Sequence, residues 1–318
     1  FCNFYNSPSL VLPPVLKNII FLMFLVGFGT KAGIVPLHIW LPYAHPHAPS
    51  HISSLMSGVM IKTAIYGILR FVFCILGIQS TWWACALLVI AAVSCLVGIV
   101  YALMERDLKK LLAYSSVENI GIILLGAGAS MLFMKINMPL LAVFSLAAGL
   151  YHLVNHAIFK GLLFLCAGSV YKATGTRNME KLGGLIKAMP QTAFCFLIGA
   201  MAISALPPLN GFVSEWLILQ AFFSGLITGS AGIKIFFAFC AAALALTGGL
   251  PAACFVKAFG ITFLGSPRSV NAQEAKEVSF SMKAAMIFLS ALTVVFGLFA
   301  VKIFKVLAVI SGGVLGID

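Results

Sequence analysis

Residues 27–42 read Gly27-Phe28-Gly29-Thr30-Lys31-Ala32-Gly33-Ile34-Val35-Pro36-Leu37-His38-Ile39-Trp40-Leu41-Pro42. They close an apolar segment that begins near residue 18, and this segment contains both Lys31 and Pro36. A proline inside a helix removes one backbone hydrogen bond and clashes with the preceding turn. In lipid, the freed backbone groups are tolerated only where protein or water satisfies them. The stretch therefore predicts a broken transmembrane helix, over about residues 18–42, inside a helical bundle.

The composition supports a membrane protein. Of the 318 residues, 62% are hydrophobic and 9% are charged, and the mean hydropathy is +1.10. A soluble domain carries roughly 25% charged residues, so the charges here are too few to cover a surface in water. The apolar runs reach the about 20 residues that a helix needs to cross a bilayer, and they lack the alternation of barrel strands. We therefore predict an all-α, polytopic transmembrane helical bundle that forms a single membrane domain over residues 1–318.

Eight spans are expected, and the sixth is interrupted at Leu206-Pro207-Pro208-Leu209-Asn210-Gly211. The expected spans cover residues 18–42, 51–76, 81–104, 110–134, 139–171, 190–228, 233–264 and 283–305. Both broken spans carry a charge, and each is followed by a span with a lysine ahead of an aromatic–glycine pair. This order predicts inverted five-helix repeats with the first incomplete: 18–76 ends the first repeat, 81–264 forms the second, and 283–305 is a final span. Because the chain starts at Phe1 without a signal pattern, we expect a fragment of a longer polypeptide.

The positive charge is unevenly distributed among the loops. The net charge is +12, and the loops after the third, fifth and seventh spans carry half of the 20 lysines and arginines: Arg106, Lys109, Lys110, Lys172, Arg177, Lys181, Lys187, Arg268, Lys276 and Lys283. Basic loops face the cytoplasm, so both termini are expected on the outer face. No basic stretch is long enough to follow a phosphate backbone, so we expect no nucleic acid partner.

The eight cysteines indicate no metal cluster. They are scattered and mostly apolar in context, and no two form a C-x-x-C pair. This excludes the usual patterns of iron–sulfur and c-type haem sites, and the thiols are expected to be small buried hydrophobes. No cofactor is predicted.

Five charged residues inside the predicted spans are candidates for a function: Lys31, Lys62, Lys160, Glu215 and Lys257. Each would cost about 2.5–3.5 kcal/mol at mid-membrane if it faced lipid, so these side chains are expected to face the bundle interior or water. Snorkelling or a structural ion pair is the alternative. It suits Lys257, which lies near its span end, better than Lys31 or Lys62.

Further ionisable residues are arranged as a relay. His152, His156 and Lys160 recur at every fourth position and therefore share one helix face. Histidine titrates near neutrality and suits proton transfer, although a metal site or a structural histidine pair would also fit.

Glu118 is either a solvated carboxylate near a helix start or a point of proton uptake. A metal site is conceivable near the first break, but the intervening prolines favour an irregular loop there; its histidines are His38, His45, His47 and His51.

Four stretches together resemble the antiporter-like subunits of respiratory complex I and its relatives. The run 27–45 looks like the broken seventh helix of that family. The connection into the family's tenth helix looks like Asp107-Leu108-Lys109-Lys110-Leu111-Leu112-Ala113-Tyr114-Ser115-Ser116. Its eleventh helix looks like His152-Leu153-Val154-Asn155-His156-Ala157-Ile158-Phe159-Lys160, and its broken twelfth helix looks like Gly211-Phe212-Val213-Ser214-Glu215. Within the family, residues 56–62, 117–121 and 206–216 look most like the formate hydrogenlyase and hydrogenase-4 branch. Other branches usually lack a glutamate at the position of Glu118.

The resemblance implies roles for the matched residues. Lys31 corresponds to the central lysine of a first half-channel, Lys62 to the connecting lysine, and Glu215 to the terminal carboxylate of the second half-channel. His152, His156 and Lys160 match the linking helix. The family's glutamate partner of Lys31 would precede Phe1.

The implied function is proton translocation in a hydrogenase-linked complex of the cytoplasmic membrane of a prokaryote. The implied partners are sibling membrane subunits and a peripheral nickel–iron hydrogenase and iron–sulfur arm. A multi-subunit cation/proton antiporter and a quinone-reducing complex I are alternatives, and the sequence leaves H⁺ and Na⁺ open.

Overall fold

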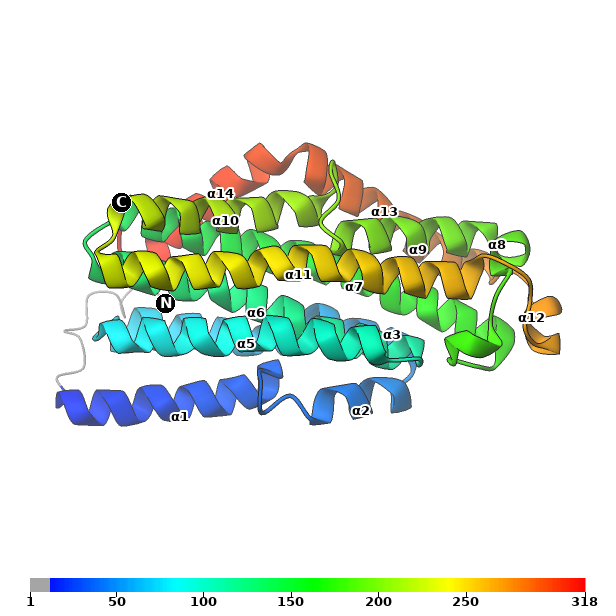
Figure 1. Ribbon diagram of the computed structural model, residues 1–318, viewed down its shortest axis with the longest axis horizontal. Helices are drawn as coiled ribbons and strands as arrows, with labels where there is room; N and C mark the ends of the chain where they lie inside the picture. The colour runs from blue at the N-terminus through cyan, green and yellow to red at the C-terminus, as the bar shows by residue number, and fades with distance from the viewer. Residues whose placement is uncertain (1–11, 318) are drawn as a thin grey trace.

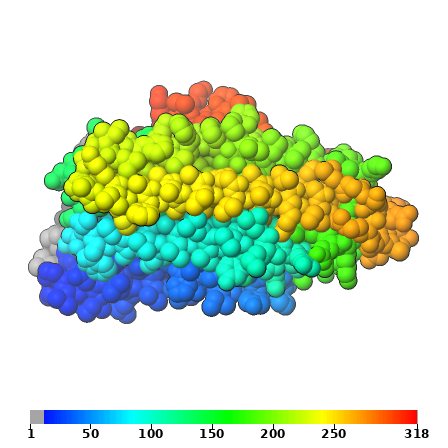
Figure 2. All heavy atoms as spheres, viewed as in Figure 1, coloured from blue at the N-terminus to red at the C-terminus, as the bar shows by residue number. Residues whose placement is uncertain are grey.

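The computed structural model describes residues 12–317, in which long helices lie side by side along one axis (Figures 1 and 2). Within this range there is no strand, and one isolated antiparallel bridge joins Asp107 to Asn178. The helices are α1 (Pro14–Ala32), α2 (Trp40–His47), α3 (Ser50–Leu55), η2 (Met56–Met60), α4 (Ile61–Ile68), η3 (Leu69–Leu76), α5 (Thr81–Met104), α6 (Leu108–Lys135), α7 (Pro139–Thr174), η4 (Met179–Lys181), α8 (Leu185–Ala188), α9 (Pro190–Ile203), α10 (Asn210–Thr228), α11 (Ala231–Phe263), α12 (Val270–Gln273), α13 (Phe280–Leu298) and α14 (Ala300–Leu315).

The predicted all-α membrane fold is confirmed. Among the described residues, eight helices are long and apolar enough to cross a membrane. The third keeps the predicted bounds, 81–104, and the second is one continuous run from Ser50 to Leu76 that includes the π-helical segments η2 and η3. The described cysteines are buried or half-buried, whereas Cys2 lies outside the described residues.

Both predicted breaks are present near the middle of the bundle, where α1 and α2, and likewise α9 and α10, lie end to end (Figure 1). Each break contains a cis peptide, Val35–Pro36 and Pro207–Pro208. Side chains from other helices satisfy the freed backbone groups: Val35 N donates to Ser94 Oγ (3.0 Å), and Asn155 Nδ2 donates to Asn210 O (2.9 Å). The two broken spans run in opposite directions, and a long helical segment follows each. The repeat itself stays a prediction.

The last span differs from the expected single helix over 283–305. Helix α13 ends at Leu298, and α14 starts at Ala300 at an angle to it (Figure 1). The carbonyl of Phe296, which a continued helix would use for its own hydrogen bonding, accepts a hydrogen bond from Tyr151 Oη instead. At Gly297 the helix lies so close to the second break that an added Cβ would clash with Pro208 O. These two contacts explain why the helix changes direction here.

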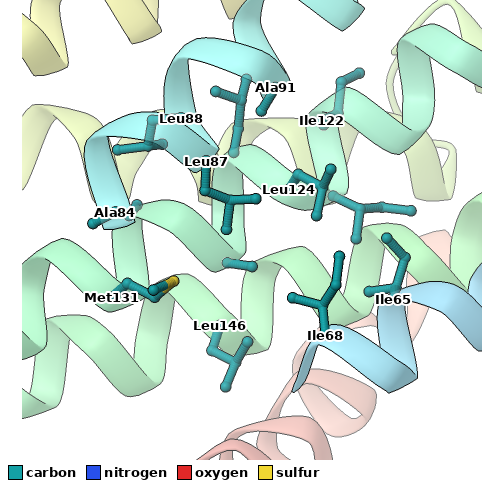
Figure 3. Close-up of a cluster of buried hydrophobic side chains, with 14 of the residues drawn as sticks. Ile65, Ile68, Ala84, Leu87, Leu88, Ala91, Ile122, Leu124, Met131 and Leu146 are labelled. Carbon is teal, nitrogen blue, oxygen red and sulfur yellow. The ribbon is translucent and has the colours of Figure 1, made fainter. Parts of the chain in front are cut away.

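Helix α6 forms the centre of the core. In its most apolar 18-residue window, 94% of the residues are buried. Helix α5 packs against it at glycines: a Cβ added to Gly98 would lie 2.5 Å from Glu118 N, and one added to Gly121 would lie 2.6 Å from Ala91 O. Small residues allow such close approach between helices in lipid. Figure 3 shows part of the surrounding apolar cluster, with side chains Ile65, Ile68, Ala84, Leu87, Leu88, Ala91, Ile122, Leu124, Met131 and Leu146.

Polar contacts connect the elements at one end of the bundle. Asp107 caps α6 by accepting from the backbone nitrogen of Lys109 (2.8 Å), and its second oxygen pairs with Arg177 Nε (3.2 Å). Arg177 also donates to Pro46 O of α2. This end carries the basic loops, so the structure gathers the positive charge on one side of the spans.

Candidate functional site

Four polar residues of α6 lie where the surrounding helices meet: Ser115, Ser116, Glu118 and Asn119, all at most 1% exposed. Each residue of a helix is turned by about 100° from the one before it, so these side chains point toward different neighbours. A buried polar group needs a hydrogen-bond partner to offset its desolvation. Each of the two serines and the asparagine has found one on another helix, and together these contacts build the site.

Lys62 of α4 connects to α6 through a serine. Its ammonium donates to the carbonyl of Ser57 in the π-helical η2, and Ser57 Oγ shares a hydrogen bond with Ser116 Oγ (2.8 Å). Lys62 is only 6% exposed, as expected from the cost of placing it in lipid. A π-helical turn is common at functional sites. Here it brings the Ser57 hydroxyl to α6.

Lys160 of α7 also binds α6. Its ammonium donates to Leu112 O (2.9 Å) and to Ser115 Oγ, and the side chain is fully buried. Lys160 therefore binds Ser115 of α6 directly, whereas Lys62 binds the carbonyl of Ser57, whose hydroxyl contacts the neighbouring Ser116. Neither lysine forms an ion pair with a described residue; the two ion pairs in the described range are Arg106–Glu180 and Arg177–Asp107.

His152 links α6 to α10. Asn119 Nδ2 donates to Ser115 O (2.8 Å), which leaves Asn119 Oδ1 to accept from His152 Nε2 (3.1 Å). The opposite ring nitrogen, Nδ1, lies 3.0 Å from Ser214 Oγ of α10. Ser214 Oγ is also within reach of Asn210 O and Gly211 O at the second break. A rotation of one hydroxyl therefore lets Nδ1 accept or donate a proton.

His156 fills the interval between His152 and Lys160. It is fully buried, and neither ring nitrogen has a hydrogen-bond partner among the described residues. Its ring lies 6.5 Å from that of His152, as the spacing of one helical turn requires. The imidazole thus has both nitrogens available between two groups that can exchange protons.

Two carboxylates lie near these lysines and histidines without a cation paired to them. Glu118 is 1% exposed, and its Oε2 has no partner among the described residues. The alternative of a solvated carboxylate near the helix start is therefore wrong, because Glu118 lies ten residues inside α6. Glu215 is 6% exposed and follows Ser214 directly, and the two carboxylates are within electrostatic range of each other. A Cβ added to Gly248 of α11 would lie 3.6 Å from Glu215 Oε2.

Two predicted site residues lie outside this network. Lys31 is in the last turn of α1, at the edge of the bundle, and its side chain is exposed. Lys257 is half-buried on α11 and donates to Leu103 O (2.5 Å) and Glu105 O (2.8 Å) at the end of α5. The structure therefore brings together Lys62, His152, His156, Lys160, Glu118 and Glu215. The participation of Lys31 and Lys257 stays a prediction.

Sequence reasoning missed the groups that connect the ionisable residues. Ser57, Ser115, Ser116, Asn119 and Ser214 are unremarkable in a sequence, since serine and asparagine occur in many helices and only packing shows which ones meet. A polar run in an otherwise apolar span was the available signal.

His45 lies in α2, just after the first break. It is fully buried in α2, neither of its ring nitrogens has a partner among the described residues, and its ring stacks on Phe164 at 4.7 Å. In the part of the chain that the structure describes, no three His, Cys, Asp or Glu side chains gather in a metal-binding arrangement.

Comparison with known proteins gives a consistent result. Residues 10–247 match the family model described as NADH:quinone oxidoreductase/Mrp antiporter, transmembrane. Hydrogenase-4 component B of Escherichia coli is 49% identical over 300 residues, which is 94% of this chain and 45% of that protein. Formate hydrogenlyase subunit 3 of the same organism is 43% identical over 285 residues, covering 90% of this chain and 47% of that protein. The chain thus spans about half the length of these relatives.

Among solved structures, respiratory complex I from Thermus thermophilus contains a chain with the same architecture. The TM-score is 0.78 at 27% identity, and the match covers 96% of this chain and 60% of that one. The order and breaks of the helices described above therefore follow a known membrane fold.

Proposed function

Because the chain belongs to the NADH:quinone oxidoreductase/Mrp antiporter transmembrane family, we propose that it moves protons as part of a membrane subunit of a redox-driven, hydrogenase-linked complex. The protons pass along the buried lysine, histidine and glutamate side chains of α4, α6, α7 and α10. The family assignment supports the class of activity. The names of the two similar Escherichia coli proteins support the hydrogenase-linked type of complex.

The observation that carries this proposal is the continuity of the buried polar groups. Lys62 reaches α6 through Ser57 and Ser116, and Lys160 reaches it through Ser115. An ammonium held by neutral oxygens, with no carboxylate paired to it, loses its charge more readily than one in an ion pair. Lysines in such surroundings can therefore load and release protons as nearby charges change.

The histidines complete the connection to the second break. His152 can take up or release a proton at Nδ1, which faces the Ser214 hydroxyl, while Nε2 donates to Asn119 Oδ1. His156 lies between His152 and Lys160 with both nitrogens available. A path from Lys62 to Glu215 thus needs only short transfers between side chains or through single water molecules.

We propose that partner subunits carry out the electron transfer. The similarity to hydrogenase-4 component B favours sibling membrane subunits and a peripheral nickel–iron hydrogenase and iron–sulfur arm. The basic end of the bundle, with Arg106, Lys181 and Arg268, would face the cytoplasm. On this arrangement the η3–α5 and α6–α7 connections lie on the outer face.

The proposal is tested by Glu215→Gln in the full-length protein within its assembled complex. Proton uptake in sealed vesicles and redox activity with an artificial electron acceptor are measured side by side. We expect uptake to fall by about tenfold or more, as for loss of a proton-transferring group, while redox activity with the artificial acceptor persists. The matched control is Glu274→Gln, because Glu274 is exposed and outside the spans.

Uptake at the original rate in the Glu215→Gln complex would contradict the proposal and leave Glu215 with a structural role. Uptake that requires Na⁺ in the unmodified complex would favour the cation/proton antiporter alternative, since the description of the family also names antiporters.

A further inference from the structure

We propose, building on the function above, that protons reach the buried network from the basic end of the bundle between α5, α6 and α11, and that Lys257 passes them to Glu118. The juxtaposition behind this proposal is a small cavity at the basic end that is lined in part by charged residues, Lys257 in its lining, and an unpartnered carboxylate on the neighbouring helix α6. In the part of the chain that the structure describes, this is the one arrangement that would connect Lys257 both to the surface and to the interior of the bundle.

The cavity, here called the intake cavity, has a volume of about 150 Å³ and lies where α5 ends. Its lining includes Glu105, Arg106, Glu180 and Lys257. Arg106 and Glu180 form an ion pair of 2.9 Å, and their side chains are 73% and 53% exposed, so the mouth of the cavity meets water. A cavity of this size that is lined in part by charged side chains has room for several water molecules. Protons from solvent can therefore reach Lys257.

Lys257 is held at the inner wall by backbone carbonyls. Its ammonium donates to Leu103 O (2.5 Å) and Glu105 O (2.8 Å), which belong to the last turn of α5 and the residue after it. No described carboxylate forms an ion pair with it. The four-carbon stem of lysine is flexible. The ammonium can therefore leave these carbonyls and turn toward the interior.

The face of α11 leads from Lys257 toward Glu118. Cys254 lies one turn deeper, is fully buried, and is within electrostatic range of Lys257, Glu118 and Lys160 together. Glu118 lies beside Gly98 on α5, five residues before Leu103, which corresponds to about 7.5 Å along a helix. A turn of the lysine side chain together with bridging water would span that interval.

Glu118 has the chemistry of the acceptor. Its Oε2 is buried without a hydrogen-bond partner among the described residues, and the group lies one turn from Ser115, to which Lys160 donates. In the proposed step the Lys257 ammonium gives one proton to the Glu118 carboxylate, which leaves a neutral amine and a neutral carboxylic acid. Lys257 regains a proton from the intake cavity, and Glu118 passes its proton to Lys160.

A structural role for Lys257 is the competing explanation. A cation at the end of α5 stabilises the free carbonyls and the helix dipole there. Replacement by methionine would harm the protein under either explanation. Arginine separates them, because it keeps the charge and can donate to the same carbonyls but does not release its proton in proteins.

The test uses the full-length protein in its complex, in sealed vesicles. Lys257→Arg, Lys257→His and Glu118→Gln are compared with the control Lys187→Arg, since Lys187 is an exposed lysine at the same end. We expect Lys257→Arg and Glu118→Gln each to lower proton uptake at least about fivefold with redox activity retained. Lys257→His, which can still exchange protons, should recover part of the rate.

Uptake at the original rate with Lys257→Arg would show that Lys257 only caps α5 and would overturn the inference, as would an unaffected Glu118→Gln complex. Glu215→Gln is measured in the same series. Loss of uptake with Glu215→Gln but not with Lys257→Arg rejects this route alone, whereas no loss in any variant rejects the proposed function itself.

Discussion

At the scale of single residues, neutral groups separate the charged ones in the candidate site. Ser57 stands between Lys62 and Ser116 of α6, and Ser214 stands between His152 and the second break. A buried ion pair would hold each lysine in its charged form, whereas a hydroxyl accepts or donates with little preference. The hydroxyls and amides are therefore as important to the proposed path as the titratable groups.

Ser214→Ala tests this view of the neutral groups. Removing the hydroxyl leaves His152 Nδ1 without its neighbour on α10, so we expect proton uptake by the complex in vesicles to fall by about tenfold. Ser214→Thr keeps the hydroxyl and should retain most of the rate. Equal rates of proton uptake in the two variants would mean that the proton moves past His152 without using the Ser214 hydroxyl.

At the scale of helices, the sequence predicted the spans better than their ends. Helix α5 has the expected bounds because apolar length and flanking loops determine them. The division of the last span at Phe299 depends on Tyr151 and on the backbone of the second break, which are far from it in sequence. In the same way, the serines of α6 could be identified as part of the site only once the neighbouring helices were known.

The close contact between α5 and α6 leads to a prediction about stability. Gly98→Ala places a methyl group 2.5 Å from Glu118 N, and a backbone atom cannot move away without its helix. We expect the purified complex to lose about 1–3 kcal/mol of stability, as in other overpacked cores, and to melt at a lower temperature.

Gly249→Ala is the matched control for this contact, because it also changes a helical glycine but nothing lies within 4 Å of the added methyl group. Thermal denaturation followed by intrinsic fluorescence compares the two variants. Equal melting temperatures would mean that α5 and α6 are less tightly packed than described.

At the scale of the whole molecule, the surface charges and the buried polar groups lie in different parts of the bundle. The basic loops and both ion pairs of the described residues lie at one end, and the buried polar groups lie in the interior of the bundle. Lys31 is the exception, since its exposed position on α1 leaves it outside the network. Composition predicted the membrane setting, and loop charge predicted which end is basic. Neither could predict that Lys31 would be exposed whereas Lys62 is buried.

The orientation in the membrane follows from the basic end. We expect a cysteine introduced at the exposed Glu274 to react with a membrane-impermeant maleimide only from the cytoplasmic side, and one introduced at the exposed Ser230 to react only from the outside. Labelling of intact cells and of inverted vesicles distinguishes the two. The reverse pattern would place the intake cavity on the outer face.

The central claim is that protons cross the membrane through the buried groups around α6. Lys160 is the most direct place to test it, because it is fully buried and donates to Ser115 and Leu112 of that helix. The decisive measurement is proton uptake in sealed vesicles by the complex with Lys160→Met, alongside redox activity with an artificial electron acceptor. We expect uptake to be lost and redox activity to remain. Uptake that continues at the rate of the unmodified complex would contradict the claim.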